Sequence, residues 1–155
     1  MTGAAMDTPL WAPSQDRIAA ANLTRFIDAV RRKHGAPVHD YPALYAWSIA
    51  EPERFWQAVW SFCCVIGTQG RTVLADACKM PGARWFPEAR LNFAENLLRR
   101  RDGETAIVFR GEDRVRSSLS HAELYDEVSR LAQALRASGV KAGDRVAAYM
   151  PNLPA

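Results

Sequence analysis

The sequence predicts an α/β protein in which an aromatic-rich helical segment precedes the first strands and helix of an incomplete sheet. Apolar residues recur at helical spacing upstream of residue 103. Downstream, the run TAIVFR over 105–110 is β-branched and aromatic, and the run VAAYM over 146–150 is continuously apolar. We therefore expect a loose lead-in over 1–13, a helical segment over 14–102, and the start of a sheet-forming domain over 103–155.

Composition and charge indicate a globular protein. Hydrophobic residues make up 48% of the 155 residues and charged residues 24%, and the formal net charge is +3. Most arginines alternate with Asp and Glu, so we interpret them as a solvated surface and expect no nucleic-acid partner. The N-terminus lacks the regions of a secretory signal, and the most apolar run, over 59–67, is too short to span a bilayer. We expect a cytoplasmic protein without a membrane partner.

The helical segment carries clear start and stop signals. Ser14 is a candidate N-cap for one amphipathic helix, which the basic run over 31–33 and Gly35 would end. Pro42 and Pro52 each suit the first turn of a further helix, where a missing N–H costs nothing.

Aromatic residues crowd between Asp40 and Gly67, and helical spacing puts several on one wide apolar face. Its members are Phe55, Trp56, Val59, Trp60, Phe62 and Cys63. Such a face can stack on nucleic-acid bases. Because no Lys or Arg occurs between Arg54 and Arg71, we interpret it as core or as a domain-docking surface. Farther on, helical spacing over 91–98 precedes Arg99–Arg101, which we interpret as cations at a helix C-terminus.

The sheet-forming segment predicts a strand over 105–110, a turn over 111–113 and a returning strand over 115–119. Ser120 and Glu123 then form a capping box for a helix that ends at Gly139. A stripe on that helix is expected to be buried: Leu124, Val128, Leu131, Ala132 and Leu135. After a turn over 141–144, we expect a parallel strand over 145–150 that lacks its neighbours within this chain.

No catalytic constellation is present in the sequence. It contains neither of two glycine-rich phosphate-binding motifs, G-x-x-x-x-G-K-[ST] and G-x-G-x-x-G. The acidic pairs Glu112-Asp113 and Asp126-Glu127 indicate solvation, because adjacent carboxylates point apart. His121 in a helix first turn suggests a surface histidine, and His39 beside Asp40 has no identifiable nucleophile. We predict no catalytic or metal-binding residue and assign no cofactor-binding residue.

Three cysteines, Cys63, Cys64 and Cys78, form no disulfide framework and have no metal-ligand spacing with the histidines. We expect buried structural thiols, which fits a reducing compartment.

Two stretches resemble a known enzyme family. Residues 119–152, LSHAELYDEVSRLAQALRASGVKAGDRVAAYMPN, resemble the opening of the adenylate-forming (acyl-CoA synthetase) domain. Upstream, WSI at 47–49, ERFW at 53–56 and LNFAENLL at 91–98 resemble the N-terminal extension of short-chain acyl-CoA synthetases, which assigns 14–102 to that extension. LNFAENLL is more similar to the acetoacetyl-CoA synthetases than to the acetyl-CoA synthetases. The resemblance covers about residues 10–155.

The resemblance implies that the parent enzyme activates acetoacetate with Mg-ATP to an acyl adenylate, and that the CoA thiol then displaces AMP. ATP, Mg²⁺ and CoA are therefore implied for the parent. In the family, the phosphate loop, the adenine-binding motifs and the mobile C-terminal lysine lie downstream of the GDRV strand and have no counterpart here. We expect this chain alone to be inactive, to bind none of these ligands well, and to have the remainder of the enzyme as its possible partner.

Two departures from the family and two alternatives accompany this interpretation. His121 stands where the family usually has an aromatic residue. Ala155 stands where a glutamate commonly follows the PNxP motif, and we interpret Ala155 as a cut in the reading frame. The chain also fits a fragment of an acetyl- or propionyl-CoA synthetase, since the acyl pocket lies elsewhere in the family. The last alternative is a non-catalytic interaction module that pairs with a separately encoded remainder.

Overall fold

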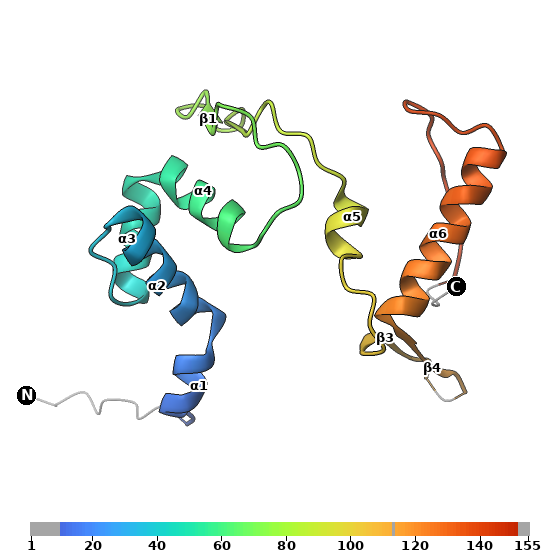
Figure 1. Ribbon diagram of the computed structural model, residues 1–155, viewed down its shortest axis with the longest axis horizontal. Coiled ribbons are helices and arrows are strands. Elements are labelled where there is room, and N and C mark those ends of the chain that lie inside the picture. Colours follow the sequence, from blue (N-terminus) through green and yellow to red (C-terminus); the bar gives the residue numbers. More distant parts are fainter. Residues whose placement is uncertain (1–9, 113, 152–155) are drawn as a thin grey trace, which may run out of the picture. The chain divides into compact units, whose positions relative to one another are not determined.

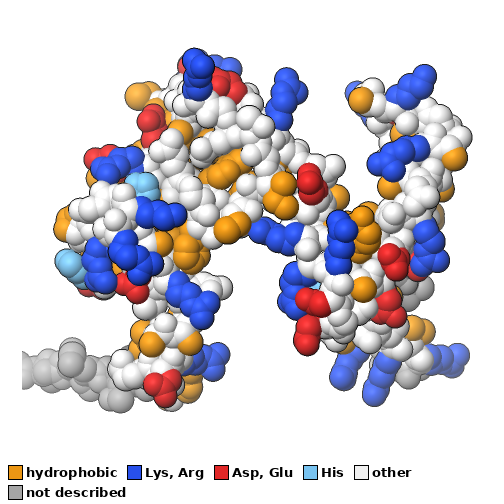
Figure 2. All heavy atoms as spheres, in the orientation of Figure 1, with side chains coloured by type: hydrophobic (Ala, Val, Ile, Leu, Met, Phe, Trp, Pro, Cys, Tyr) orange, Lys and Arg blue, Asp and Glu red, His pale blue; other side chains and the backbone are white. Residues whose placement is uncertain are grey.

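The computed structural model describes residues 10–112 and 114–151. It divides into two compact units, the first ending at Arg90 and the second beginning at Leu91 (Figure 1). Three sequence-based expectations lie partly outside the described residues: the lead-in over 1–9, the turn at Asp113, and Ala155. On the face drawn in Figure 2, Lys and Arg side chains are spread among Asp and Glu, as expected of a solvated surface.

The described part of the first unit, from residue 10 on, contains four helices: α1 Gln15–Ala20, α2 Asn22–His34, α3 Tyr41–Ala50 and α4 Pro52–Phe62. Ser14 caps α1 by accepting a hydrogen bond from the Arg17 N–H, as predicted. Gly35 ends α2 in the left-handed conformation with φ of 60°, also as predicted. Pro42 and Pro52 both lie in first turns of helices, which confirms their interpretation.

The prediction of one continuous helix after Ser14 was wrong, because the chain breaks at Ala21. Ala21 is extended, with ψ of 141°, and it separates α1 from α2. The Thr24 hydroxyl donates to the Ile18 carbonyl at 2.6 Å, which satisfies a carbonyl near the end of α1. No residue at the break is a helix breaker, so spacing alone could not locate it. The buried part of the predicted stripe is confined to α2, at Phe26, Ile27 and Val30.

The core of the first unit lies among α2, α3 and α4, which pack together in Figure 1. Its buried members are Phe26, Ile27, Val30, Ala36, Val38, Leu44, Trp47 and Ala58. Phe55, Val59 and Phe62 pack against this cluster, which confirms the core interpretation for the centre of the aromatic face. Trp56 and Trp60 instead contact Trp85 and Phe86, with ring centroids 5.8 and 5.2 Å apart. The aromatic face therefore joins the helical bundle to the segment that follows it.

That segment forms a small antiparallel pair, β1 Leu74–Ala75 with β2 Arg84–Trp85. An isolated bridge between Thr68 and Arg90 holds its two ends together. The Glu88 side chain also joins the end of this segment to its beginning, through hydrogen bonds from Arg71 and Thr72. One carboxylate oxygen accepts from the Arg71 N–H at 2.7 Å, and the other accepts from the Thr72 hydroxyl at 2.8 Å.

The second unit contains α5 Phe93–Leu97, β3 Thr105–Arg110, β4 Arg116–Ser120 and α6 His121–Ala137. β3 and β4 pair antiparallel with Val108 opposite Ser118, which confirms the predicted hairpin. α6 begins at the predicted capping box. It ends in a Schellman arrangement at Gly139: the Gly139 N–H donates to the Arg136 carbonyl and the Val140 N–H to the Leu135 carbonyl.

Two expectations for the second unit were wrong in the described residues. Residues 145–150 form no strand, because no neighbouring segment pairs with their N–H and C=O groups. The stripe of α6 is only partly buried: Leu124, Val128, Ala132 and Leu135 are half-buried, and Leu131 is 62% exposed. β3 and β4 contact α6. Met150 lines a hollow together with Leu124 and Leu131, and Leu98 lines another together with Val128 and Ala132, so the stripe is covered in part.

Candidate functional site

The capping box fixes where α6 begins and therefore which side chains share each of its faces. The Ser120 hydroxyl accepts from the Glu123 N–H at 3.2 Å, and the Glu123 carboxylate accepts from the Ser120 N–H at 2.8 Å. The backbone hydrogen bond from Ser120, and then the bond from its hydroxyl, lower the pKa of Glu123 below its ordinary value. The charged Glu123 carboxylate thus stabilises the first turn of α6.

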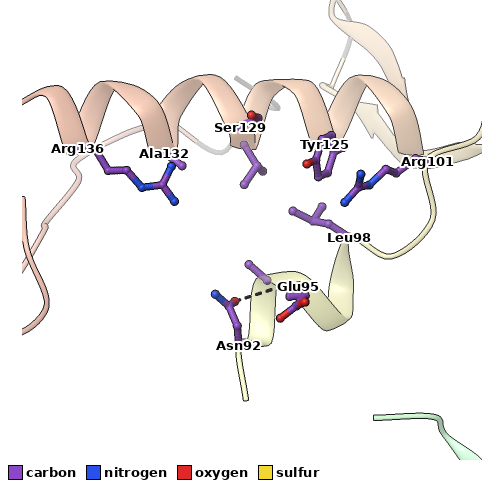
Figure 3. A pocket seen from close by; sticks show the side chains of 10 residues that line it. Asn92, Glu95, Leu98, Arg101, Tyr125, Ser129, Ala132 and Arg136 are labelled. Atoms are coloured by element: carbon purple, nitrogen blue, oxygen red, sulfur yellow. Dashed lines mark hydrogen bonds between the residues drawn. The ribbon is translucent and has the colours of Figure 1, made fainter. Parts of the chain in front are cut away.

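A hollow of about 340 Å³ lies between α5 and α6 in the second unit (Figure 3). Its α6 wall contains Tyr125, Ser129, Ala132 and Arg136, which share one face because they are spaced by four, three and four residues. On the opposite side lie Asn92, Glu95 and Leu98. Arg101 and Arg136 point into the hollow from its two ends in Figure 3.

The three arginines of the run Arg99–Arg101 make different contacts. Only Arg99 has the predicted role of a cation at a helix C-terminus. The Arg99 guanidinium donates to the Asn96 carbonyl at 3.0 Å in the last turn of α5. Arg100 pairs with Asp102 at 2.9 Å. Arg101 lies over the ring of Tyr125, 3.8 Å from its centroid. The prediction of a purely capping role was wrong for Arg101, because its side chain reaches α6.

Asp102 anchors the turn before β3. Partial desolvation acts to raise its pKa, but hydrogen bonds from the Arg100 side chain and the Glu104 N–H, together with the charges of Arg100 and His121, lower it overall. The Ala122 N–H also donates to the Asp102 carbonyl at 3.0 Å. The turn is thereby tied to the first residues of α6.

Several groups that line the hollow can donate or accept hydrogen bonds. Its polar groups are two guanidinium groups, the hydroxyls of Tyr125 and Ser129, the amide of Asn92 and the carboxylate of Glu95. None of these pairs a nucleophile with a general base. Across residues 10–112 and 114–151, no group of three or more His, Cys, Asp or Glu side chains is arranged to hold a metal ion.

Among the described residues, the histidines and acidic pairs that the sequence analysis weighed as possible site residues lie outside this hollow. Asp40 caps α3 by accepting from the Ala43 N–H at 2.8 Å, and it does not orient His39, which is exposed. His121 is the first residue of α6, and its N–H donates to the Glu104 carbonyl at 3.0 Å. Glu127 pairs with Arg130 and not with its neighbour Asp126. Glu112 is exposed, and Asp113 is outside the described residues.

His34 was missed by the sequence analysis. Its ring lies 5.8 Å from that of Trp47, at the end of α2. Desolvation first, and then the positive charges of Arg54 and Lys33, lower the pKa of His34. The Arg54 guanidinium also donates to the His34 carbonyl at 2.9 Å. The basic last turn of α2 was visible in the sequence, but the approach of Arg54 from α4 requires the tertiary fold.

The expectation of buried thiols was wrong, since Cys63, Cys64 and Cys78 are all exposed. Cys63 and Cys64 lie just beyond the last turn of α4, where the chain leaves the bundle, and Cys78 lies in the loop between β1 and β2. Helical spacing placed Cys63 on the apolar face but carried no information about where the helix ends.

Two family profiles match this chain, one mostly in its first half and one in its second half. The profile described as "Acetyl-coenzyme A synthetase N-terminus" matches residues 41–97, and that of "AMP-binding enzyme" matches residues 93–155. The acetoacetyl-coenzyme A synthetase of Rhizobium meliloti (strain 1021) is 50% identical over 148 residues, which are 96% of this chain and 23% of that protein. The chain is homologous to the N-terminal portion of acetoacetyl-CoA synthetases. The family resemblance stated from the sequence is thereby confirmed.

A solved acetoacetyl-CoA synthetase from Streptomyces lividans supports the same assignment. It matches 95% of this chain and 23% of its own with a TM-score of 0.80 and 43% sequence identity. The acetoacetyl-CoA synthetase of Danio rerio is 33% identical over 147 residues. The chain thus spans under a quarter of the length of these acetoacetyl-CoA synthetases, at 22–23%. The match also confirms the incomplete α/β architecture. None of the described helices is both long and apolar enough to cross a bilayer.

Proposed function

We propose that this chain is the N-terminal part of an ATP-dependent acetoacetate–CoA ligase. The parent would convert acetoacetate, ATP and CoA to acetoacetyl-CoA, AMP and pyrophosphate through an acyl adenylate. The observation that carries this proposal is the continuous match to acetoacetyl-CoA synthetases across both units of the chain. ATP, Mg²⁺ and CoA are the ligands proposed for the parent, and its location is proposed to be cytoplasmic.

We further propose that the 155 residues are not catalytic by themselves. Adenylation needs groups that hold the triphosphate and offset the charge that develops during attack on the α-phosphate. The sequence has no glycine-rich phosphate loop, and the hollow between α5 and α6 has no nucleophile–base pair. The chain's contribution would be to complete the fold of the ligase, with 14–102 as the N-terminal extension and 103–155 as the start of the AMP-binding domain.

A chimera tests the proposal. The matching N-terminal segment of the Rhizobium meliloti acetoacetyl-CoA synthetase would be replaced by this chain, with a segment-deleted form as the control. Acetoacetate-dependent exchange of pyrophosphate into ATP is expected for the chimera and not for the deleted form or for the 155-residue chain. A folded, soluble chimera without exchange would contradict the parent activity. Exchange by the isolated chain would contradict its non-catalytic state.

A further inference from the structure

Two adjacent exposed thiols end α4. Cys63 is the C-cap residue, with φ of −77° and ψ of −1°, and Cys64 follows it. Both side chains are exposed, and the Cys64 thiol lies 3.8 Å from the Phe62 carbonyl oxygen. Solvent exposure makes both thiols accessible to soluble reagents.

Cys64 is one of three described non-glycine residues with positive φ, together with Asp76 and Phe86. Two other helices, α2 and α6, end with glycine in the left-handed region, Gly35 with φ of 60° and Gly139 with φ of 85°. At the end of α4, the residue with φ of 50° is Cys64. A side chain in this region costs about 1–2 kcal/mol relative to ordinary backbone conformations. Of the three residues with this strain, Cys64 is the one whose side chain is a thiol beside a second thiol.

We propose that Cys63 and Cys64 are a reversible dithiol–disulfide pair and the modification site of this chain for small-molecule disulfides. The thiolate of one cysteine attacks a sulfur of the disulfide RSSR, forms a mixed disulfide and releases one RS⁻. The second cysteine thiolate then attacks the mixed disulfide at the protein sulfur, closes the Cys63–Cys64 bond and releases the second RS⁻. Two protein thiols are oxidised, one RSSR is reduced, and the two thiol protons pass to the released thiolates.

The spacing of the pair makes this disulfide labile rather than structural. Adjacent Cα atoms across a trans peptide are about 3.8 Å apart. Unstrained disulfides join Cα atoms that are about 4.4–6.8 Å apart. The ring that joins Cys63 to Cys64 is therefore strained, and strained exposed disulfides are readily reduced by small thiols. The site would respond to the balance of disulfides and thiols around it.

Oxidation would also change the surroundings of α4. The Cys63 side chain lines an apolar hollow together with Phe26, Tyr41 and Phe62. Bond formation with Cys64 draws the Cys63 sulfur toward the turn. Trp60, one helical turn before Cys64, contacts Phe86, so its fluorescence is a convenient reporter of a change at this end of α4.

The test is oxidation of the purified 155-residue chain with oxidised glutathione, followed by alkylation of remaining thiols and trypsin digestion. Cleavage after Arg54, Arg71 and Lys79 puts Cys63 and Cys64 on one peptide and Cys78 on another. The first peptide should lose two hydrogens, carry no glutathione and escape alkylation. Dithiothreitol should restore both thiols.

Matched variants distinguish the Cys63–Cys64 disulfide from a simple mixed disulfide with glutathione. Cys63→Ser and Cys64→Ser should each give a glutathione adduct in place of the ring, whereas Cys78→Ser should still form it. Because oxidation is read on peptides, a variant that alters stability remains informative when the same reaction is run in urea. A wild-type peptide that carries glutathione adducts, that is linked to a second chain, or that stays fully alkylated would overturn the proposal.

Discussion

At the scale of single residues, Gly70 and Gly35 are required for different physical reasons. Both have positive φ, at 83° and 60°. A Cβ atom at Gly70 would lie 2.6 Å from the Glu88 Cβ, whereas one at Gly35 would meet nothing within 4 Å. Gly35→Ala should therefore cost about 1 kcal/mol for backbone strain alone. Gly70→Ala should cost about 2–4 kcal/mol, because steric overlap adds to the same strain.

All five tryptophans precede residue 91, so tryptophan fluorescence during urea unfolding reports on the first unit, which contains both glycines. The free energy of unfolding of the two variants is the quantity to compare. Equal losses would mean that Glu88 moves aside without cost.

Glu88 predicts a pH dependence of the same region. Hydrogen bonds from the Arg71 N–H first, and then from the Thr72 hydroxyl, lower the pKa of Glu88 from its ordinary value of 4.5. Since the folded pKa is the lower one, this link stabilises the fold above about pH 4.5 and is lost as pH falls through the folded pKa. Glu88→Gln should remove that part of the acid sensitivity, and Thr72→Val should reduce it. Urea midpoints measured from pH 6 to pH 3 check this, and an unchanged slope in Glu88→Gln would refute it.

At the scale of elements, the capping box of α6 predicts a local change in stability. Ser120→Ala removes the acceptor for the Glu123 N–H and should weaken the first turn by about 1 kcal/mol. Amide hydrogen exchange in the first turns of α6 should then accelerate about fivefold if it follows local opening. Ser129→Ala, in the middle of the same helix, is the control and should leave those amides unchanged. Equal acceleration in both variants would mean that α6 opens as a whole.

The same elements show what the sequence could and could not predict. The Ser120 cap, the Gly139 stop and the 105–119 hairpin were correct because their signals lie within a few residues of one another. Residues 145–150 have the composition of a strand, but a strand exists only when another segment pairs with it. The exposed cysteines and the Arg101–Tyr125 contact were missed for a related reason. They depend on where a helix ends in space and on which element lies opposite.

At the scale of the whole molecule, Leu131 is the exposed member of an otherwise half-buried stripe on α6. Leu131 is 62% exposed here, while the chain spans 23% of the Rhizobium meliloti acetoacetyl-CoA synthetase. A half-buried apolar stripe gains stability when another element removes more of its surface from water. We therefore expect the stripe to be buried when this chain is part of a full-length ligase, and to limit the solubility of the 155-residue chain.

One substitution distinguishes the two contexts. Leu131→Glu should leave the stability of the 155-residue chain nearly unchanged and raise its solubility, because the side chain already contacts water. In the Rhizobium meliloti chimera the same change should cost more than about 3 kcal/mol, since it would bury an unpaired carboxylate. Gln133→Glu adds the same charge on the opposite side of α6 and should be tolerated in both proteins. Thermal unfolding of the four variants measures the difference. A chimera that tolerates Leu131→Glu as well as Gln133→Glu would show that the stripe stays exposed and that α6 does not pack against the rest of the ligase through this face.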